Sequence, residues 1–284
     1  MIDFGSTPPI PEFNPTSKEH LGNYRRVYKS SEERAKKETD PKDELASYLA
    51  AYDEAGVSKI VIKARDVEST FGLKIRNEDV AAFCRGQGSR FIGFAGVDPH
   101  KGMAAIRELE HAVRELGLRG LNIQCFESKV AINDAKLYPL YAKCIELDIP
   151  VNIHVGINFS TATSMEYGRP VLLDQVMMHF PDLKVIAAPP GWPWVTELIG
   201  VAWRHPNVHI GLVAMRAKYL GVENSGYEPL LQYGNTVLQD RMIFGSAWPM
   251  QPIKQAIADI DGLPLKDTTK QKWLHDNAAR LLGL

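Results

Sequence analysis

The sequence has little cysteine, almost no net charge and no long hydrophobic run, and each deficit excludes a class of protein. Its three cysteines, Cys84, Cys125 and Cys144, are widely spaced and form no C-x-x-C pair. This excludes a disulfide framework and a zinc knuckle, and we expect all three to be small buried apolar residues. Because 33 Lys and Arg balance 34 Asp and Glu, we expect no nucleic-acid partner.

Membrane and secretion signals are also missing. No apolar segment approaches the roughly 18 residues that a membrane helix requires. The first residues lack the basic flank and apolar stretch of a signal peptide. We therefore expect a cytoplasmic protein with no membrane partner. No G-x-S-x-G motif is present, so the nucleophile elbow of a serine hydrolase is not indicated.

What is present is a regular alternation of β-branched runs and amphipathic helical segments. The predicted strands are Ile2–Gly5, Lys59–Lys63, Phe91–Gly96, Gly120–Gln124, Pro150–Val155, Leu183–Ala188, Asn207–Val213 and Arg241–Ser246. The predicted helices are Lys42–Ala55, Asn77–Arg85, Met103–Leu116, Ala135–Leu147, Leu172–His179, Trp194–Arg204, Tyr227–Leu238, Pro252–Ile260 and a terminal Lys266–Leu282. This alternation predicts an α/β protein, a single-domain (β/α)8 barrel over residues 1–284 with its active site in the loops after the strands.

One segment interrupts the alternation. Residues 8–43, from Pro8 to Asp43, are too long for a simple connection after the first strand. Ser30 with Glu33 three residues later predicts a cap for a short extra helix through Lys37. Because the segment follows a barrel strand, it should lie on the catalytic face, where it would form a lid. A solvated surface insertion or an oligomer contact is the alternative.

Several segments, most of them at predicted strand ends, together carry a resemblance to a known family. They are Ile2-Asp3-Phe4, Arg90–Pro99, Gly117–Leu121, Pro150–Gly156, Leu183–Ala188, Gly191–Trp194, Phe244–Ser246 and Asn277–Leu282. In this order the chain resembles the amidohydrolase superfamily, in the amidohydrolase-2 branch that includes aminocarboxymuconate-semialdehyde decarboxylase. The resemblance implies the barrel fold, a hydrolase or carboxy-lyase activity and a homodimer.

The resemblance also implies a zinc or manganese ion at the barrel mouth. In the family, a His-x-His after strand one, a His after strand five and an Asp after strand eight hold the metal, and a His after strand six acts as acid and base. Of these positions, this sequence keeps His154 alone. The others carry Gly5, Thr7, Pro189 and Ala247. One imidazole cannot retain the ion, because affinity comes from three or four ligands together, so we expect no metal cofactor.

A metal site rebuilt from other residues remains open. Asp3, Cys125 and His209 have the right donor chemistry and lie on or just after predicted strands. Side chains alternate between the two faces of a strand, so only some of these donors would face the barrel interior. We expect Asp3 to satisfy buried backbone or loop groups, and His209 to pack beneath the mouth or against a helix.

His154 is the candidate catalytic residue. An imidazole at the end of strand five is placed for proton transfer or for binding a substrate carboxylate. Alternatively it is a vestigial ligand in a pocket wall, and we favour binding over catalysis. After strand two, Lys63 and Arg65 would present positive charge to an anionic ligand. The alternative is an ion pair between Arg65 and Asp66, with Lys63 solvated.

The remaining candidate ligand-binding residues are polar or aromatic. Asn122 and Gln124 lie near the end of strand four, and Phe159, Trp192 and Trp248 lie in loops after strands. Aromatic walls with few polar groups suit a flat aromatic ligand. Loop packing is the alternative interpretation for the aromatic residues.

Three functions from different classes remain open. The first is a metal-independent descendant that binds a small aromatic or carboxylate ligand, with at most acid and base chemistry at His154. The second is an active metal-dependent hydrolase or decarboxylase with a rebuilt site. The third is a non-catalytic subunit that pairs with a metal-bearing homologue. Function resides in the site and not in the fold, so the resemblance does not choose among them; we favour the first.

Overall fold

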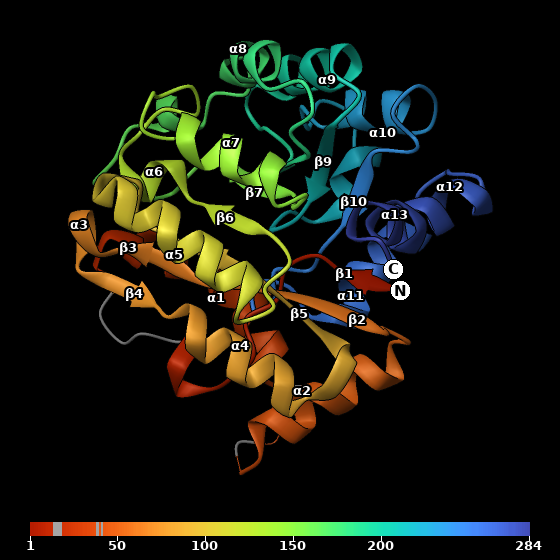
Figure 1. Cartoon of the computed structure of the whole chain (residues 1–284). Coiled ribbons are helices and arrows are strands. Elements are labelled where there is room, and N and C mark those ends of the chain that lie inside the picture. The colour runs from red at the N-terminus through yellow and green to blue at the C-terminus, as the bar shows by residue number, and fades with distance from the viewer. Residues whose placement is uncertain (14–18, 38–39, 41) are drawn as a thin grey trace.

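Eight parallel strands form one sheet that curls into a nearly closed barrel (Figure 1). The computed structural model describes residues 1–13, 19–37, 40 and 42–284. In sheet order the strands are β1 (Ile2–Asp3), β2 (Lys59–Lys63), β5 (Phe91–Gly96), β6 (Leu121–Ile123), β7 (Val151–His154), β8 (Val185–Ala188), β9 (Val208–Leu212) and β10 (Met242–Phe244). The predicted α/β barrel and its strand order are confirmed, although most strands are shorter than predicted.

Helices cover the outside of the barrel, as Figure 1 shows. They are α2 (Glu44–Glu54), α4 (Asn77–Gly86), α5 (Met103–Arg114), α7 (Tyr138–Glu146), α8 (Leu172–His179), α9 (Val195–Arg204), α10 (Glu228–Gly234) and α11 (Ile253–Asp261). The predicted terminal helix is present as α12 (Asp267–Gln271) and α13 (Asn277–Leu282), joined by a π-helical turn at Lys272–Asp276.

Backbone hydrogen bonds draw the first and last strands together. The amide of Phe4 donates to the carbonyl of Phe244 at 3.0 Å, and the amide of Thr7 donates to the carbonyl of Trp248 at 2.9 Å. Closure leaves few unpaired strand edges and brings the carboxyl ends of all the strands to one mouth.

The apolar core has two parts, because strand side chains alternate between the barrel interior and the surrounding helices. The interior cluster contains Ile2, Phe4, Val61, Ile92, Phe94, Ile186, Ala188, Val213 and Ile243. A larger cluster fills the space between strands and helices. Since Val61 is an interior residue, Lys63, two positions later on β2, faces the interior at the mouth.

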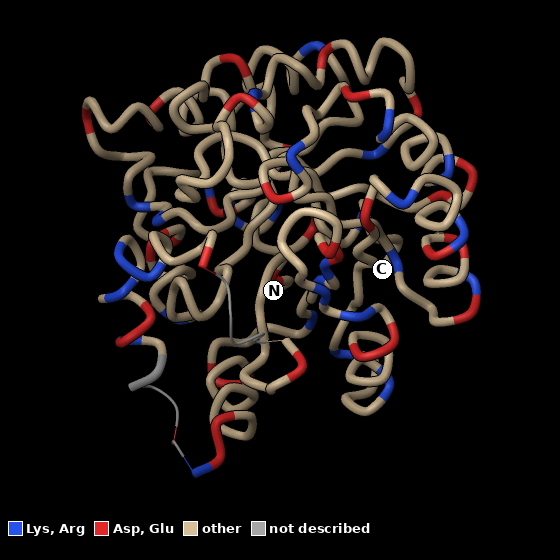
Figure 2. Tube along the Cα trace, turned by 90° about the vertical axis from the view of Figure 1, so that its left-hand side faces the viewer, with Lys and Arg blue, Asp and Glu red and all other residues tan. Residues whose placement is uncertain are grey.

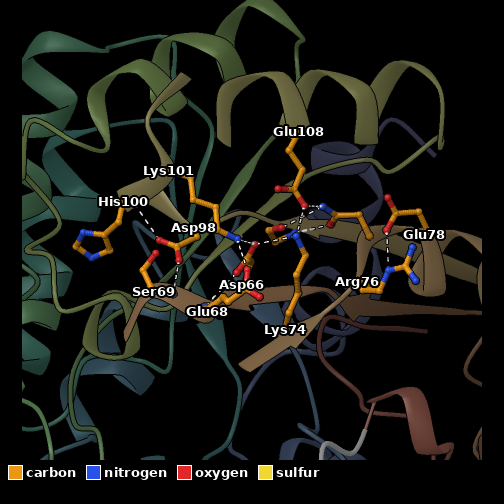
Figure 3. A network of polar contacts seen from close by, with 12 residues as sticks. Asp66, Glu68, Ser69, Lys74, Arg76, Glu78, Asp98, His100, Lys101 and Glu108 are labelled. Atoms are coloured by element: carbon orange, nitrogen blue, oxygen red, sulfur yellow. Dashed lines mark hydrogen bonds and ion pairs between the residues drawn. The ribbon is translucent and has the colours of Figure 1, made fainter. Parts of the chain in front are cut away.

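A small hairpin after β2 was not predicted. Strands β3 (Arg65–Val67) and β4 (Leu73–Ile75) are antiparallel and flank α3 (Glu68–Phe71). An ion network secures this hairpin to α5 and the segment after β5 (Figure 3). In it the carboxylate of Asp66 lies 2.7 Å from Nζ of Lys101 and 2.9 Å from Nζ of Lys74. The hairpin therefore depends on charges that are distant in sequence.

The insertion after β1 contains a longer helix than the sequence predicts. Helix α1 spans Gly22–Lys37 and follows the 3-10 turn η2 (Glu19–Leu21). Ser30 lies in the middle of α1, so its predicted role as a helix cap is wrong. Tyr24 and Tyr28, four residues apart on one helix face, pack onto the barrel, and this tertiary packing outweighs a local capping signal. Residues 14–18, 38–39 and 41 of the predicted insertion lie outside the described part of the chain.

Acidic and basic residues are interspersed along the chain trace in Figure 2, and neither sign gathers in one region of that view. In the ranges that the structure describes, no helix combines the length and the apolar character needed to cross a membrane. The three cysteines are free thiols. Cys125 and Cys144 are buried as expected, whereas Cys84 is only partly buried, which corrects the expectation for that residue.

Candidate ligand site at the barrel mouth

A lysine ammonium lies inside the mouth of the barrel. Nζ of Lys63 lies 5.1 Å from the centroid of the Phe4 ring and 3.4 Å from Oδ1 of Asn152. Burial lowers the pKa of Lys63 to about 8, while the charge of Asp3 opposes and that of Arg65 reinforces this shift. The alternative ion pair between Arg65 and Asp66 is wrong, because Asp66 pairs with Lys74 and Lys101 and Arg65 pairs with Glu127. Lys63 is partly buried.

A row of hydrogen-bonded side-chain amides lies next to Lys63. Asn152 donates from Nδ2 to Oδ1 of Asn122 at 2.9 Å, and Gln124 donates to the same oxygen at 3.0 Å. Asn122 in turn donates from Nδ2 to the carbonyl of Ala64 at 3.0 Å. Through Asn152, which bonds to Lys63, the predicted site residues Asn122 and Gln124 belong to the same polar group as the lysine.

His154 ends β7 and lies beside the ring of Phe126, with 4.6 Å between ring centroids. Burial lowers the pKa of His154 to about 4; nearby Glu127 raises it, and Arg65 and Lys63 lower it further. The imidazole is therefore neutral at pH 7. Its Nδ1 is buried and has no hydrogen-bond partner among the other described residues.

A buried carboxylate, which the sequence analysis did not predict as a site residue, also belongs to this group. Glu127 lies in α6 (Cys125–Ser128), directly after β6, and its side chain is fully buried. Oε1 lies 2.8 Å from Nε2 of His20, and Oε2 lies 3.3 Å from Nη1 of Arg65. Its position after a barrel strand was the available signal, because strand ends supply catalytic-face residues.

Aromatic residues of the insertion pack onto the same end of the barrel. Tyr24 lies edge-on to Phe159 with 5.3 Å between ring centroids and stacks on Phe126 at 6.3 Å. Tyr28 also contacts Phe159 and donates from Oη to the carbonyl of Ala214 at 2.8 Å. Burial raises the pKa of both phenols, so they remain neutral. Helix α1 thus contacts segments that follow β6, β7 and β9.

The residues at the family's metal positions do not fit a metal ion. A Cβ atom added to Gly5 would lie 3.2 Å from Cγ1 of Val213 and 3.4 Å from Nζ of Lys63. Ala247 packs against the interior apolar cluster, and Thr7 is exposed. Among the described residues, no group of at least three His, Cys, Asp or Glu side chains is arranged to hold a metal. The lysine lies where a cationic metal would meet like charge.

The residues considered for a rebuilt metal site are dispersed. Asp3 points away from the interior and accepts hydrogen bonds from Ser246 and Tyr52. His209 lines a cavity of about 350 Å³ with Lys184 and Arg241, at the ends where the strands begin. That cavity is at the opposite end of the barrel from His154. Cys125 is buried, and burial raises the pKa of its thiol to about 12, which disfavours a thiolate ligand.

The two tryptophans expected at the site lie elsewhere in the mouth region. Trp248 is buried against Tyr48 of α2, with 4.9 Å between ring centroids, and belongs to the outer core. Trp192 follows β8 and is 37% exposed. Neither has a ring contact with the group around His154 among the contacts found in the described chain.

Comparison with known proteins identifies the family. The amidohydrolase family model matches residues 25–284. An uncharacterised TIM-barrel protein from Bordetella bronchiseptica is 30% identical with a TM-score of 0.81, over 100% of this chain and 98% of that one. A 2,6-dihydroxybenzoate decarboxylase from Rhizobium is 17% identical with a TM-score of 0.66, over 99% and 97%. A manganese-bound dihydroxybenzoic acid decarboxylase from Polaromonas is 18% identical with a TM-score of 0.66, over 100% and 96%.

At these lower identities the decarboxylases show that the fold is shared, and no more. The family match covers nearly all of the chain, and the Bordetella protein aligns over its whole length. The chain therefore belongs to the amidohydrolase family, in the amidohydrolase-2 branch.

Proposed function

We propose that this barrel binds a small aromatic carboxylate at its mouth and does so without a metal ion. The observation that carries the proposal is the ammonium of Lys63, which faces the interior beside Gly5, one of the replaced metal-ligand positions. A partly buried cation that lacks a carboxylate partner in the described chain favours an anionic ligand, because the ligand would replace lost solvation.

Two further features support an aromatic ligand. The rings of Tyr24, Phe126 and Phe159 lie together next to His154, and aromatic walls bind flat apolar groups well. The ligands named for the structural neighbours, such as 2,6-dihydroxybenzoate, are of this class. We propose that α1 is the lid of this site and that Arg65, held by Glu127, adds positive charge near the ligand.

His154 determines the chemistry open to the bound ligand. A neutral imidazole accepts a proton at a ring nitrogen or hydrogen bonds to a ligand hydroxyl. It adds no fixed positive charge at pH 7, since burial keeps its pKa at about 4. We therefore propose ligand binding with at most acid and base catalysis at His154.

Calorimetric titration with benzoate and with 2,6-dihydroxybenzoate tests this function. We expect Lys63→Met to weaken binding roughly 10- to 100-fold, the cost of a lost charge-assisted hydrogen bond. His154→Phe should lower the affinity for 2,6-dihydroxybenzoate more than the affinity for benzoate. His111→Gln on the exposed surface of α5 is the matched control. Equal affinity of wild type and Lys63→Met would contradict the proposal.

Elemental analysis of protein purified without chelators tests the absence of a metal. We expect substoichiometric zinc, manganese and iron; a tightly held stoichiometric ion would support the metal-dependent enzyme instead. We also propose that the protein is a homodimer, which native mass spectrometry distinguishes from a complex with a metal-bearing homologue. We also propose a cytoplasmic location, which cell fractionation tests.

A further inference from the structure

Lys63 has the surroundings of a reactive amine. Its side chain enters the barrel interior from the end of β2, where the ring of Phe4 lies on one side and the backbone of Gly5 on another. The residue as a whole is partly buried at the mouth. The Phe4 ring favours the ammonium through a cation–π contact, whereas burial disfavours the protonated form and is the larger effect.

The ammonium form of Lys63 is poorly satisfied. It can donate three hydrogen bonds, yet the contact to Oδ1 of Asn152 at 3.4 Å is long. In the part of the chain that the structure describes, no carboxylate lies within ion-pairing distance of Nζ. Burial keeps the pKa of Lys63 at about 8. At pH 7 roughly a tenth of such lysines are neutral, on the order of a hundredfold more than for an exposed lysine.

We propose that Lys63 is a nucleophilic amine that forms an imine with a small aldehyde or ketone bound at the mouth. This inference deepens the proposed function and rests on it, because it assigns the ligand class: an aromatic or carboxylate compound that carries a carbonyl group. A desolvated lysine in an apolar site is a recurrent carbonyl nucleophile.

The reaction balances without any further reactant. The lone pair of Nζ attacks the carbonyl carbon, the new C–N bond forms, and the π electrons move to the oxygen. A proton moves from nitrogen to that oxygen to give a carbinolamine. Loss of one water then yields the imine, and addition of water reverses the sequence and frees Lys63. Water mediates the proton transfers, and the sequence of steps assigns no charge change to any other side chain.

The amide row lies on one side of the amine. Asn152 makes the long 3.4 Å contact to Nζ through its side-chain oxygen, and its own Nδ2 donates to Asn122. The protonated imine would also withdraw electrons from the ligand. A metal ion has the same effect when it polarises a carbonyl group.

Reductive trapping tests the inference. The full-length protein is incubated at pH 7 with 4-carboxybenzaldehyde and sodium cyanoborohydride, and intact mass and peptide mapping follow. We expect an adduct with the mass of the aldehyde less one oxygen on Lys63, in addition to one on the N-terminal amine of Met1, whose pKa is also below that of an ordinary lysine. Formation of the Lys63 adduct should be at least about tenfold faster than on any surface lysine, given the difference in neutral amine.

Two variants separate the outcomes. Lys63→Arg keeps the charge but cannot form an imine and should lose the adduct. Lys59→Arg, at the other end of β2, should keep it. Peptide mapping of the wild type gives the answer even if a variant fails to fold. Labelling spread over surface lysines, unchanged in Lys63→Arg, would overturn the inference.

Calorimetry with benzoate distinguishes this failure from failure of the proposed function. If benzoate binds in a Lys63-dependent manner but no adduct forms on Lys63, the site is real and the imine chemistry is refuted. If benzoate does not bind and Lys63 is not labelled, both proposals are refuted.

Discussion

Nε2 of His20 lies 2.8 Å from Oε1 of Glu127, and this pair ties the insertion after β1 to the segment after β6. The two residues are 107 positions apart in the sequence. The ring of His20 also stacks on Phe71 of α3 at 3.9 Å. A buried carboxylate is costly to leave without partners, so this contact fixes the start of α1 over the barrel mouth.

Removing the hydrogen bond of His20 should loosen the insertion. The His20→Phe variant keeps the stacking on Phe71 but leaves Glu127 with one partner fewer. We expect the free energy of unfolding to fall by about 1–3 kcal/mol and trypsin to cleave faster at Arg25 and Arg26. Urea denaturation and limited proteolysis measure the two effects, with exposed Glu19→Gln as the control. Unchanged cleavage would show that the pair does not hold α1.

Stability should fall as the pH drops from about 6.5 to about 4. Burial lowers the pKa of both His154 and His209 to about 4 from an ordinary value of 6.5. Between these pH values the two imidazoles bind protons in the unfolded chain but remain neutral in the folded protein. Acid therefore lowers the free energy of unfolding by up to about 3 kcal/mol for each imidazole.

Urea denaturation at several pH values measures this dependence. The variants His154→Phe and His209→Phe should each flatten it, whereas His111→Gln on the exposed surface of α5 should not. A wild-type free energy of unfolding that stays constant from pH 6.5 to pH 4 would refute the burial argument.

Asp3 should be required for barrel closure. Its Oδ1 accepts from the amide of Ser246 at 2.8 Å, and its Oδ2 accepts from Oη of Tyr52 at 2.7 Å and from Oγ of Ser246 at 2.5 Å. In Asp3→Asn, one of the two accepting oxygens becomes an NH2 group, which cannot accept the hydrogen bonds that these groups donate. We expect a loss of about 2–4 kcal/mol in the free energy of unfolding, compared with about 1 kcal/mol for Tyr52→Phe. Equal stability of Asp3→Asn and wild type would show that this carboxylate does not link β1 to β10.

Restoring the family's ligands and its acid–base histidine should create a metal site that binds zinc more tightly when the lysine is removed as well. The four restoring changes are Gly5→His, Thr7→His, Pro189→His and Ala247→Asp. The ammonium of Lys63, 3.4 Å from the Cβ position of Gly5, would repel Zn²⁺. We expect zinc affinity to rise at least about tenfold when Lys63→Leu is added, as measured by competition with a chelating dye. A folded five-fold variant that binds no zinc would show that these positions do not converge.

The sequence by itself determined the alternation of strands and helices and their order around the barrel, because periodicity is a local property of the chain. Together with the family resemblance it also led to the prediction that the metal site is lost, because Gly5, Thr7 and Ala247 stand where the resemblance places metal ligands and Pro189 stands where it places the acid–base histidine. Local signals failed where packing decides: the capping pattern at Ser30 was overridden by the contacts of Tyr24 and Tyr28.

Only the tertiary structure decided which side chains meet. Lys63 and Asn152 are 89 residues apart, and no local pattern predicts that β2 and β7 place them in contact inside one mouth. Strand alternation leaves the direction of Asp3 and His209 open until the barrel closes and fixes the inner face of each strand. The charge state of Lys63 and His154 follows from that closure, because removing water from a group changes its pKa and the sequence does not specify where water is excluded.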